Sequence, residues 1–153
     1  MDNIDKKIIS ILQKNARMTN ADLAEKIGMS RSPVFERVKK LERSGVITKY
    51  IALINPDMVG IQCFTYVEVT LIRHGQEAVV RFISSITKLH EVMECHHITG
   101  EADFLLKIAT RDIAAYEDFI LHKLTALPDV QNLKTMVVLS TMKNETSLPV
   151  KGE

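Results

Sequence analysis

The sequence predicts an α+β protein with two parts, because the spacing of its apolar residues changes near position 46. Before that position apolar residues recur every three or four residues, which is typical of amphipathic helices. After it, stretches of alternating apolar and polar residues, typical of half-buried strands, come between further stretches of helical spacing. A chain of 153 residues is long enough to form two small domains.

Two short helices are expected at the start of the chain. Asp2 is a suitable N-cap for the first, which ends near Asn15. Thr19 and Asp22 have the three-residue spacing of a capping box, with Asp in place of the usual Glu, and Gly28 stops the second helix. The inward faces of these helices are formed by Ile4, Ile8, Ile11, Leu12, Leu23, Ala24 and Ile27.

A third helix follows a tight turn at residues 28–30. Ser30 caps this helix, Pro33 falls in its first turn, where a missing N–H costs little, and Gly45 follows its end. Three helices with a tight turn between the second and third match the helix-turn-helix arrangement. In that arrangement the third helix lies in the major groove of DNA.

The outward face of the third helix is the predicted DNA interface. With Val34, Val38 and Leu41 turned inward, its basic and polar residues point outward. We expect base contacts from Arg31, Ser32 and Glu36 with Pro33 shaping the entry, and phosphate contacts from Arg37, Lys39, Lys40, Arg43 and the helix start at Ser30. The alternative is that these charges only solvate a surface helix.

The distribution of charge favours the DNA interpretation. Residues 1–50 hold 11 Lys and Arg against 6 Asp and Glu, whereas the remaining residues hold 9 against 13. A basic first part and an acidic second part indicate that only the first part binds a polyanion.

The second part begins with a strand or extended linker and continues as alternating strands and helices. We expect the linker over residues 46–54, strands over 63–72, 92–99, 103–110 and 134–142, and helices over 79–86 and 113–127. Gly100-Glu101-Ala102 forms the turn between the second and third strands. Strand, helix, strand, strand, helix, strand is the order of the ferredoxin-like fold.

A ferredoxin-like sheet carries both helices on one face, so its other face needs a cover. Since the strands are strongly β-branched and the domain is small, a second copy of the chain is the natural cover, and self-association is expected. The predicted boundaries are 1–50 for a helix-turn-helix, winged-helix-like domain, 51–62 for a linker strand, 63–143 for the ferredoxin-like domain, and 144–153 for a tail without fixed structure.

A series of motifs in linked order carries a resemblance to a known family. They are IDKKII at 4–9, NAR at 15–17, LAEKIGMS at 23–30, VFERVKKLE at 34–42, GVI at 45–47, YIALINP at 50–56, TGEADFLL at 99–106 and LPDV at 127–130. Over nearly the whole chain the sequence resembles the Lrp/AsnC family of leucine-responsive and asparagine-responsive regulators. The resemblance implies a DNA-binding domain and an effector-sensing, ferredoxin-like oligomerisation domain, with dimers that assemble further, commonly into octamers.

The resemblance also implies an amino-acid site in crevices between subunits. It places at that site the residues Thr99, Gly100, Glu101, Ala102, Asp103, Met136, Val137 and Val138. An amino acid presents an ammonium, which Asp103 suits, and a carboxylate, which backbone N–H groups near Gly100 suit. Apolar neighbours favour leucine or methionine as effector. The alternative is that Gly100 and Asp103 are ordinary turn residues.

Other patterns point away from metal sites, catalysis and membranes. His90-Glu91 and Cys95-His96-His97 contain metal-ligand residue types, but on a strand Cys95 and His97 point away from His96, so we expect no metal. Cys63 and Cys95 lie in apolar stretches, consistent with reduced thiols. No phosphate loop, nucleophile elbow or catalytic carboxylate pair occurs, so we expect no enzyme and no cofactor. No apolar run approaches a bilayer span, and we expect a cytoplasmic, nucleoid-associated protein.

The sequence therefore predicts a sequence-specific regulator that binds double-stranded DNA and responds to an amino acid. One alternative is an amino-acid-binding oligomerisation module, or a nucleoid-associated protein without a specific operator. Another is a small metabolic enzyme on a ferredoxin-like scaffold, which the fold permits.

Overall fold

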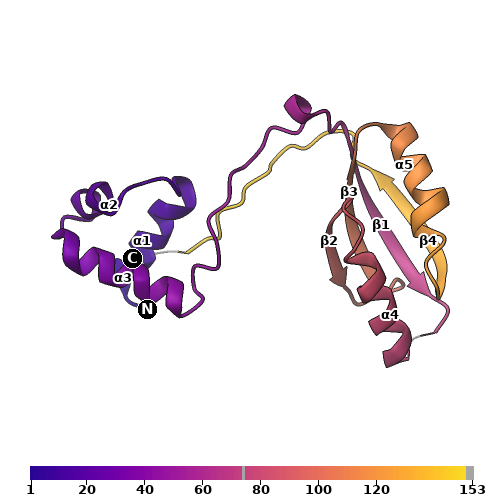
Figure 1. Cartoon of the computed structure of the whole chain (residues 1–153), viewed down its shortest axis with the longest axis horizontal. Helices are drawn as coiled ribbons and strands as arrows, with labels where there is room; N and C mark the ends of the chain where they lie inside the picture. The colour runs from indigo at the N-terminus through magenta and orange to yellow at the C-terminus, as the bar shows by residue number, and fades with distance from the viewer. Residues whose placement is uncertain (74, 151–153) are drawn as a thin grey trace. The chain divides into compact units, whose positions relative to one another are not determined.

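The computed structural model describes residues 1–73 and 75–150, which form two compact units (Figure 1). One unit contains residues 1–53 together with residues 143–150, and the other contains residues 54–142. Each has its own hydrophobic core. The α+β fold class and the division into a helical and a mixed part are confirmed.

The helical unit contains α1 (Asn3–Lys14), α2 (Asn20–Ile27) and α3 (Arg31–Arg43). The fully or nearly fully buried side chains of Ile8, Leu23 and Val34 bring the helices together in one core. Because each helix buries only one stripe, the opposite stripe of α3 is left for other contacts.

The ends of these helices follow the expected local rules with one exception. The Asp2 carboxylate accepts a hydrogen bond from the Asp5 N–H at 2.9 Å, and the Asp5 carboxylate accepts one from the Asp2 N–H at 3.1 Å, a complete capping box. Gly28 ends α2 in the left-handed conformation at φ 79°, which is unfavourable for residues that carry a side chain. Ser30 takes the N-cap position of α3, but its hydroxyl forms no capping hydrogen bond with the described residues of that helix.

Residues 46–54, all of them described, form an extended linker without a strand. A short 3₁₀ turn at Asp57–Val59 follows, and Gly60 ends it at φ 74°. Of the two forms expected for residues 46–54, the structure therefore has the extended linker.

The mixed unit is an antiparallel sheet covered by helices. Its elements are β1 (Cys63–Leu71), α4 (Gln76–Ile86), β2 (Val92–His97), β3 (Phe104–Thr110), α5 (Ile113–Phe119), a π-helical turn (Ile120–Leu124) and β4 (Val130–Val137). The strands lie in the order β2-β3-β1-β4, and all neighbouring strands pair antiparallel. This order confirms the ferredoxin-like arrangement.

Both helices pack on one face of this sheet (Figure 1). Alternate residues of β1 are buried, and Val67 and Val69 meet Phe82 of α4 and Phe119 of α5 in the core. On the opposite face Lys107 contacts Glu94 at 3.0 Å. One face of the sheet is thus a closed apolar core and the other carries partly exposed polar and apolar side chains.

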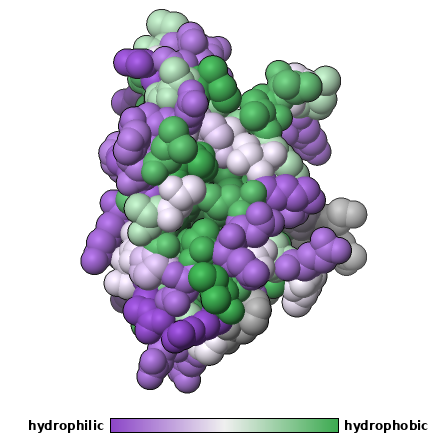
Figure 2. Space-filling view, turned by 90° about the vertical axis from the view of Figure 1, so that its right-hand side faces the viewer, coloured by the Kyte–Doolittle hydropathy of each residue, from purple (hydrophilic) through white to green (hydrophobic). Residues whose placement is uncertain are grey.

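The mixed unit also exposes apolar side chains, which Figure 2 shows among polar ones on one side of the molecule. The large exposed ones include Val80, Ile83, Met93, Ile113, Leu121, Met136, Val137, Leu139 and Met142. Exposed apolar surface of this extent is compatible with the expected self-association, which stays a prediction.

The last strand differs from its expected position. We expected residues 134–142, whereas β4 runs from Val130 to Val137. The strand begins directly after Asp129, and its pairing with β1 extends from Leu71 opposite Val130 to Thr65 opposite Val137. Because the pairing ends near the start of β1, the apolar residues after Val138 have no strand to pair with in this sheet.

The C-terminal segment was expected to lack fixed structure, yet it contacts α1. The Gln13 side chain donates a hydrogen bond to the Leu148 carbonyl at 3.2 Å and accepts one from the Leu148 N–H at 2.6 Å. Val150 packs against the core of the helical unit. Residues 151–153 of the expected tail lie outside the described residues.

Candidate DNA interface and effector turn

The outward face of α3 presents almost all of the residues expected to contact DNA. The exposed ones are Ser30, Arg31, Ser32, Pro33, Glu36, Lys39, Lys40 and Arg43. Their exposure follows from the burial of Val34, Val38 and Leu41 on the opposite stripe. Among the exposed side chains of α3, four are basic and two, Glu36 and Glu42, are acidic, so the exposed surface of this helix has a basic excess that suits a polyanion.

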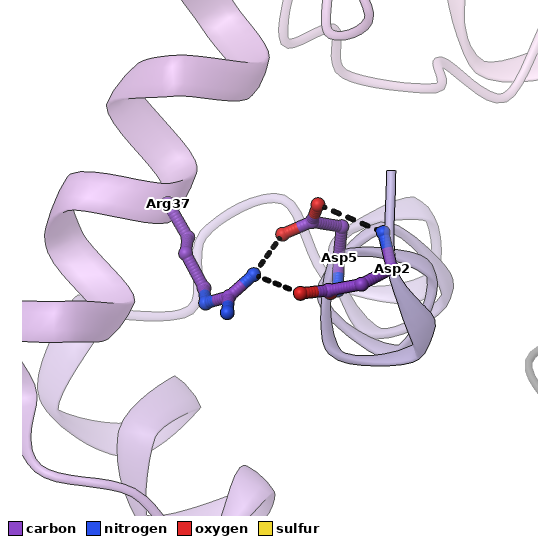
Figure 3. Close-up of polar contacts among 3 residues, drawn as sticks. All are labelled: Asp2, Asp5 and Arg37. Atoms are coloured by element: carbon purple, nitrogen blue, oxygen red, sulfur yellow. Dashed lines mark hydrogen bonds and ion pairs between the residues drawn. The ribbon is translucent and has the colours of Figure 1, made fainter.

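Arg37 is the exception, because its guanidinium already has acidic partners within the unit (Figure 3). Its Nη1 atom donates to Asp2 Oδ2 and to Asp5 Oδ1, both at 2.7 Å. The side chain is 30% exposed, and that of Asp5 is 10% exposed. In this structure Arg37 joins α3 to α1, and a contact to phosphate would have to use its other N–H groups.

This ion-pair cluster shifts the pKa of both Arg37 and Asp2. Hydrogen bonds to the carboxylates of Asp5 and Asp2 raise the pKa of Arg37. The Asp5 backbone N–H and the Arg37 guanidinium lower the pKa of the Asp2 carboxyl. Each shift favours the charged form of its group, so Arg37 and Asp2 both stay ionised at neutral pH.

The C-terminal end of α3 is tied to the linker by a second polar contact. The Tyr50 hydroxyl donates a hydrogen bond to Glu42 Oε1 at 2.9 Å. Burial and the neighbouring carboxylate raise the pKa of Tyr50 to about 12. Tyr50 is therefore a neutral donor at neutral pH, and its hydroxyl joins the linker to the C-terminal end of α3.

Phe35 is a surface residue of α3 that sequence reasoning missed. The residue is 39% exposed, and the Lys39 ammonium lies 4.8 Å from the centre of its ring. The available signal was its spacing, since position 35 falls outside the inward stripe of Val34, Val38 and Leu41. An aromatic ring thus interrupts the otherwise polar outward face of this helix.

In the mixed unit the turn between β2 and β3 is held to β1 by Asp103. Its Oδ2 accepts a hydrogen bond from the Leu71 N–H at 2.8 Å. Its own N–H donates to the Val69 carbonyl, and its carbonyl accepts from the Ile98 N–H, both at 3.0 Å. Asp103 therefore fixes this turn against the end of β1, in addition to any role in binding an effector.

The other residues of this turn, 99–102, have the glycine conformation and the surface polar side chains expected of a turn. Gly100 has φ 129°, a conformation that L residues with side chains rarely adopt. Thr99 and Glu101 are exposed, whereas Ala102 is buried. The turn therefore presents its backbone and two polar side chains to the surface.

The two groups of expected effector residues are not brought together within one chain. The turn at 99–103 adjoins Val69 and Leu71, whereas Met136 and Val137 pair with Tyr66 and Thr65. A separation of three to six residues along β1 corresponds to about 10–20 Å. One chain thus carries two separate parts of the expected site.

The His and Cys residues of β2 are engaged in ordinary contacts. His96 lies 3.1 Å from Glu94, and the His97 ring stacks on Phe104. Burial raises the pKa of the Cys95 thiol, which disfavours a thiolate ligand. Over residues 1–73 and 75–150, no group of three or more His, Cys, Asp and Glu side chains is placed to hold a metal ion.

Family models match both units. Residues 1–48 match a winged helix-turn-helix DNA-binding model, and residues 65–148 match the Lrp/AsnC ligand-binding domain. Within the described residues, no helix is both long enough and apolar enough to span a bilayer.

Named relatives and solved structures are similar over nearly the full length. The leucine-responsive regulatory protein of Klebsiella pneumoniae is 38% identical over 99% of this chain and 92% of its own length. A transcriptional regulator from Neisseria meningitidis in complex with L-methionine is 36% identical over 98% of this chain and 97% of that chain, with a TM-score of 0.94. An AsnC family transcriptional regulator from Agrobacterium tumefaciens is 32% identical over the same shares, with a TM-score of 0.93.

Proposed function

Because the chain belongs to the Lrp/AsnC family of transcriptional regulators, we propose that it binds double-stranded DNA sequence-specifically and responds to an amino acid. The response is a change in assembly or in DNA affinity, and an apolar effector such as leucine or methionine is favoured. The protein acts in the cytoplasm on chromosomal DNA and is not an enzyme. The exposed basic face of α3 is the observation that carries the proposal.

The DNA contacts divide by the position of each side chain on α3. Arg31, Ser32 and Glu36, near the N-terminal end of the helix, contact base edges, and Pro33 shapes the entry of the helix into the major groove. Lys39, Lys40 and Arg43 contact phosphates. Arg37 contacts phosphate through the N–H groups that Asp2 and Asp5 leave unused.

The N-terminal end of α3 supplies a further phosphate contact. The first N–H groups of a helix have no intrahelical acceptor, and the helix dipole favours an anion there. Ser30 supports this assignment because its hydroxyl makes no capping bond to the described residues of α3, so that hydroxyl is available to donate to a phosphate.

The effector is held between copies of the chain. Asp103 provides the negative charge for the ammonium group, and backbone donors near Gly100 face the carboxylate. Met136, Val137 and Val138 provide the apolar surface for the effector side chain. The turn and the apolar residues lie beside different positions of β1, so a second copy of the chain completes the site. This requirement supports an oligomer built from dimers, with an octamer favoured.

The test has two readings made on one preparation of the full chain. A duplex pool with a random centre is enriched by the protein, and the affinity for the enriched duplex is compared with that for a shuffled duplex of equal length. Affinity and solution mass are then measured again with each of the twenty amino acids. Preference for the enriched duplex together with a response to one chemical class of amino acids supports the proposal.

Two other results define the alternatives. Equal affinity for enriched and shuffled duplexes would indicate a nucleoid-associated protein without a specific operator. Amino-acid binding without DNA binding would indicate an oligomerisation module. The match of residues 1–48 to a winged helix-turn-helix DNA-binding model favours a DNA-binding regulator over an oligomerisation module.

A further inference from the structure

The recognition face of α3 contains an aromatic side chain in an unusual setting. Phe35 is 39% exposed on a helix whose other exposed side chains in the N-terminal half are polar, charged or proline. It lies in the second turn of α3, one turn after Arg31 and one turn before Lys39. Phe35 therefore lies between two basic positions on the part of the helix that is proposed to enter the groove.

The Phe35 ring contacts the side chain of Lys39, one turn further along α3. The ammonium lies 4.8 Å from the ring centre, a distance typical of a cation–π contact. Such a contact limits the positions of a long, flexible side chain and keeps its charge beside the ring. The Phe35 ring and the Lys39 ammonium thus form a pair in which the ring is apolar and the ammonium is cationic.

The major groove offers one apolar group to such a ring. Base edges present hydrogen-bond donors and acceptors, and the C5 methyl group of thymine is the apolar exception. A phenyl ring has no donor or acceptor to satisfy the polar edges, so it is best placed against that methyl group. The ammonium beside it then faces an adjacent phosphate, the contact already proposed for Lys39.

We propose that Phe35 is a specificity-determining residue that reads the methyl group of one thymine in the bound DNA, with Lys39 beside it. This inference rests on the proposed DNA-binding function and deepens it. The competing explanation is that Phe35 is a scattered surface apolar residue covered by Lys39, which is common on protein surfaces.

The test removes the methyl group from the DNA and the ring from the protein. The full chain enriches a duplex from a random pool, and each thymine of that duplex is replaced singly by deoxyuridine, which removes only the C5 methyl group. Affinities are measured for the wild type and for Phe35→Ala, Phe35→Leu and Val46→Ala. Val46 is a matched control, because its exposed apolar side chain belongs to the same unit but lies beyond the end of α3.

At one thymine the replacement is expected to weaken wild-type binding about fourfold, the effect of burying one methyl group. The same replacement leaves the affinity of Phe35→Ala unchanged, whereas Phe35→Leu and Val46→Ala keep the sensitivity. The salt dependence of Phe35→Ala matches that of the wild type, because no phosphate contact is lost.

Two results would overturn the inference. The first leaves the proposed sequence-specific DNA binding intact, and the second overturns it as well. If wild type and Phe35→Ala respond alike to every replacement, Phe35 reads no methyl group, although sequence-specific binding stands. If the wild type enriches no duplex, the inference falls together with the proposed sequence-specific function. Thermal unfolding of each variant shows whether a loss of affinity reflects unfolding instead of lost readout.

Discussion

Arg37 of α3 and Asp5 of α1 form an ion pair in which Nη1 and Oδ1 lie 2.7 Å apart. Asp5 is 7% exposed as a residue, so its carboxylate has little water to replace this partner. The same Nη1 atom contacts Asp2, which caps α1. The pair therefore links the start of α1 to the middle of the helix proposed to enter the DNA groove.

Replacing Arg37 with Ala is expected to destabilise the helical unit, because the Asp5 carboxylate loses its cation in a nearly buried position. We expect the melting temperature to fall by a few degrees, measured by circular dichroism at neutral pH. In an Asp5→Ala background the same change has a smaller effect. Equal effects in both backgrounds would show that the pair contributes nothing to stability.

The salt dependence of DNA binding separates phosphate contacts from internal ion pairs. We expect Lys40→Ala to weaken binding to all duplexes and to lower the slope of log affinity against log salt by about 0.9, the value for one phosphate. Arg37→Ala is expected to do the same, because its unused N–H groups contact a phosphate. An unchanged slope in Arg37→Ala would remove it from the phosphate contacts and leave its structural role.

The stability of the helical unit is expected to fall at low pH because the Asp2 carboxylate becomes protonated. Its carboxyl pKa is lowered from 3.8 by the Asp5 N–H and by Arg37. A lowered folded-state pKa contributes stability above the unfolded pKa, and this stability is lost as the pH falls through the lowered pKa. Asp2→Asn keeps a capping oxygen but does not titrate, so its melting temperature should fall less than that of the wild type below pH 3.8. Parallel curves for the two proteins would contradict this assignment.

The contact between Gln13 and Leu148 is expected to protect the C-terminal segment from proteolysis. Two hydrogen bonds join these residues. Gln13→Ala should therefore speed tryptic cleavage after Lys143 about two- to fivefold, the effect of losing roughly 0.5–1 kcal/mol. Gln131→Ala, a change at an exposed residue of β4, is the control. Cleavage at the wild-type rate in Gln13→Ala would show that the segment is not held by this contact.

Asp103→Asn separates effector binding from the fold of the turn. The Asn carbonyl oxygen can still accept from the Leu71 N–H, but the negative charge proposed to bind the effector ammonium is lost. We expect amino-acid affinity to fall about tenfold or more, measured by calorimetry with leucine and with methionine. DNA affinity without effector stays unchanged, as it does in Asp57→Asn. Wild-type effector affinity in Asp103→Asn would exclude Asp103 from the site.

Local sequence rules were sufficient for the boundaries of α1, α2 and α3 and for the order of elements, whereas α4 begins at Gln76, three residues before the expected start, and α5 ends at Phe119 with a π-helical turn to Leu124 in place of a helix to 127. Asp2, Thr19 and Gly28 act where their residue types predict, because capping depends on neighbours within a few positions. The position of β4 was wrong by about four residues at each end. Its limits are set by pairing with β1, which is distant in sequence, and not by its own apolar run.

Long-range contacts account for what sequence reasoning missed at the candidate site. Position 37 was recognised as basic, but its pairing with Asp2 and Asp5 depends on how α1 and α3 pack. The contact of Leu148 with Gln13 depends on the return of the chain end to α1. The separation of Met136 from the turn at 99–103 follows from strand register, which no local pattern contains.

The central claim is that one protein couples amino-acid binding to DNA binding. The most direct measurement is the affinity of the full chain for its enriched duplex across a titration of leucine and of methionine, with solution mass recorded at each point. The account predicts a saturable change in affinity or in assembly with at least one of them, and its loss in Asp103→Asn. An affinity and a mass that stay constant with every amino acid would contradict it.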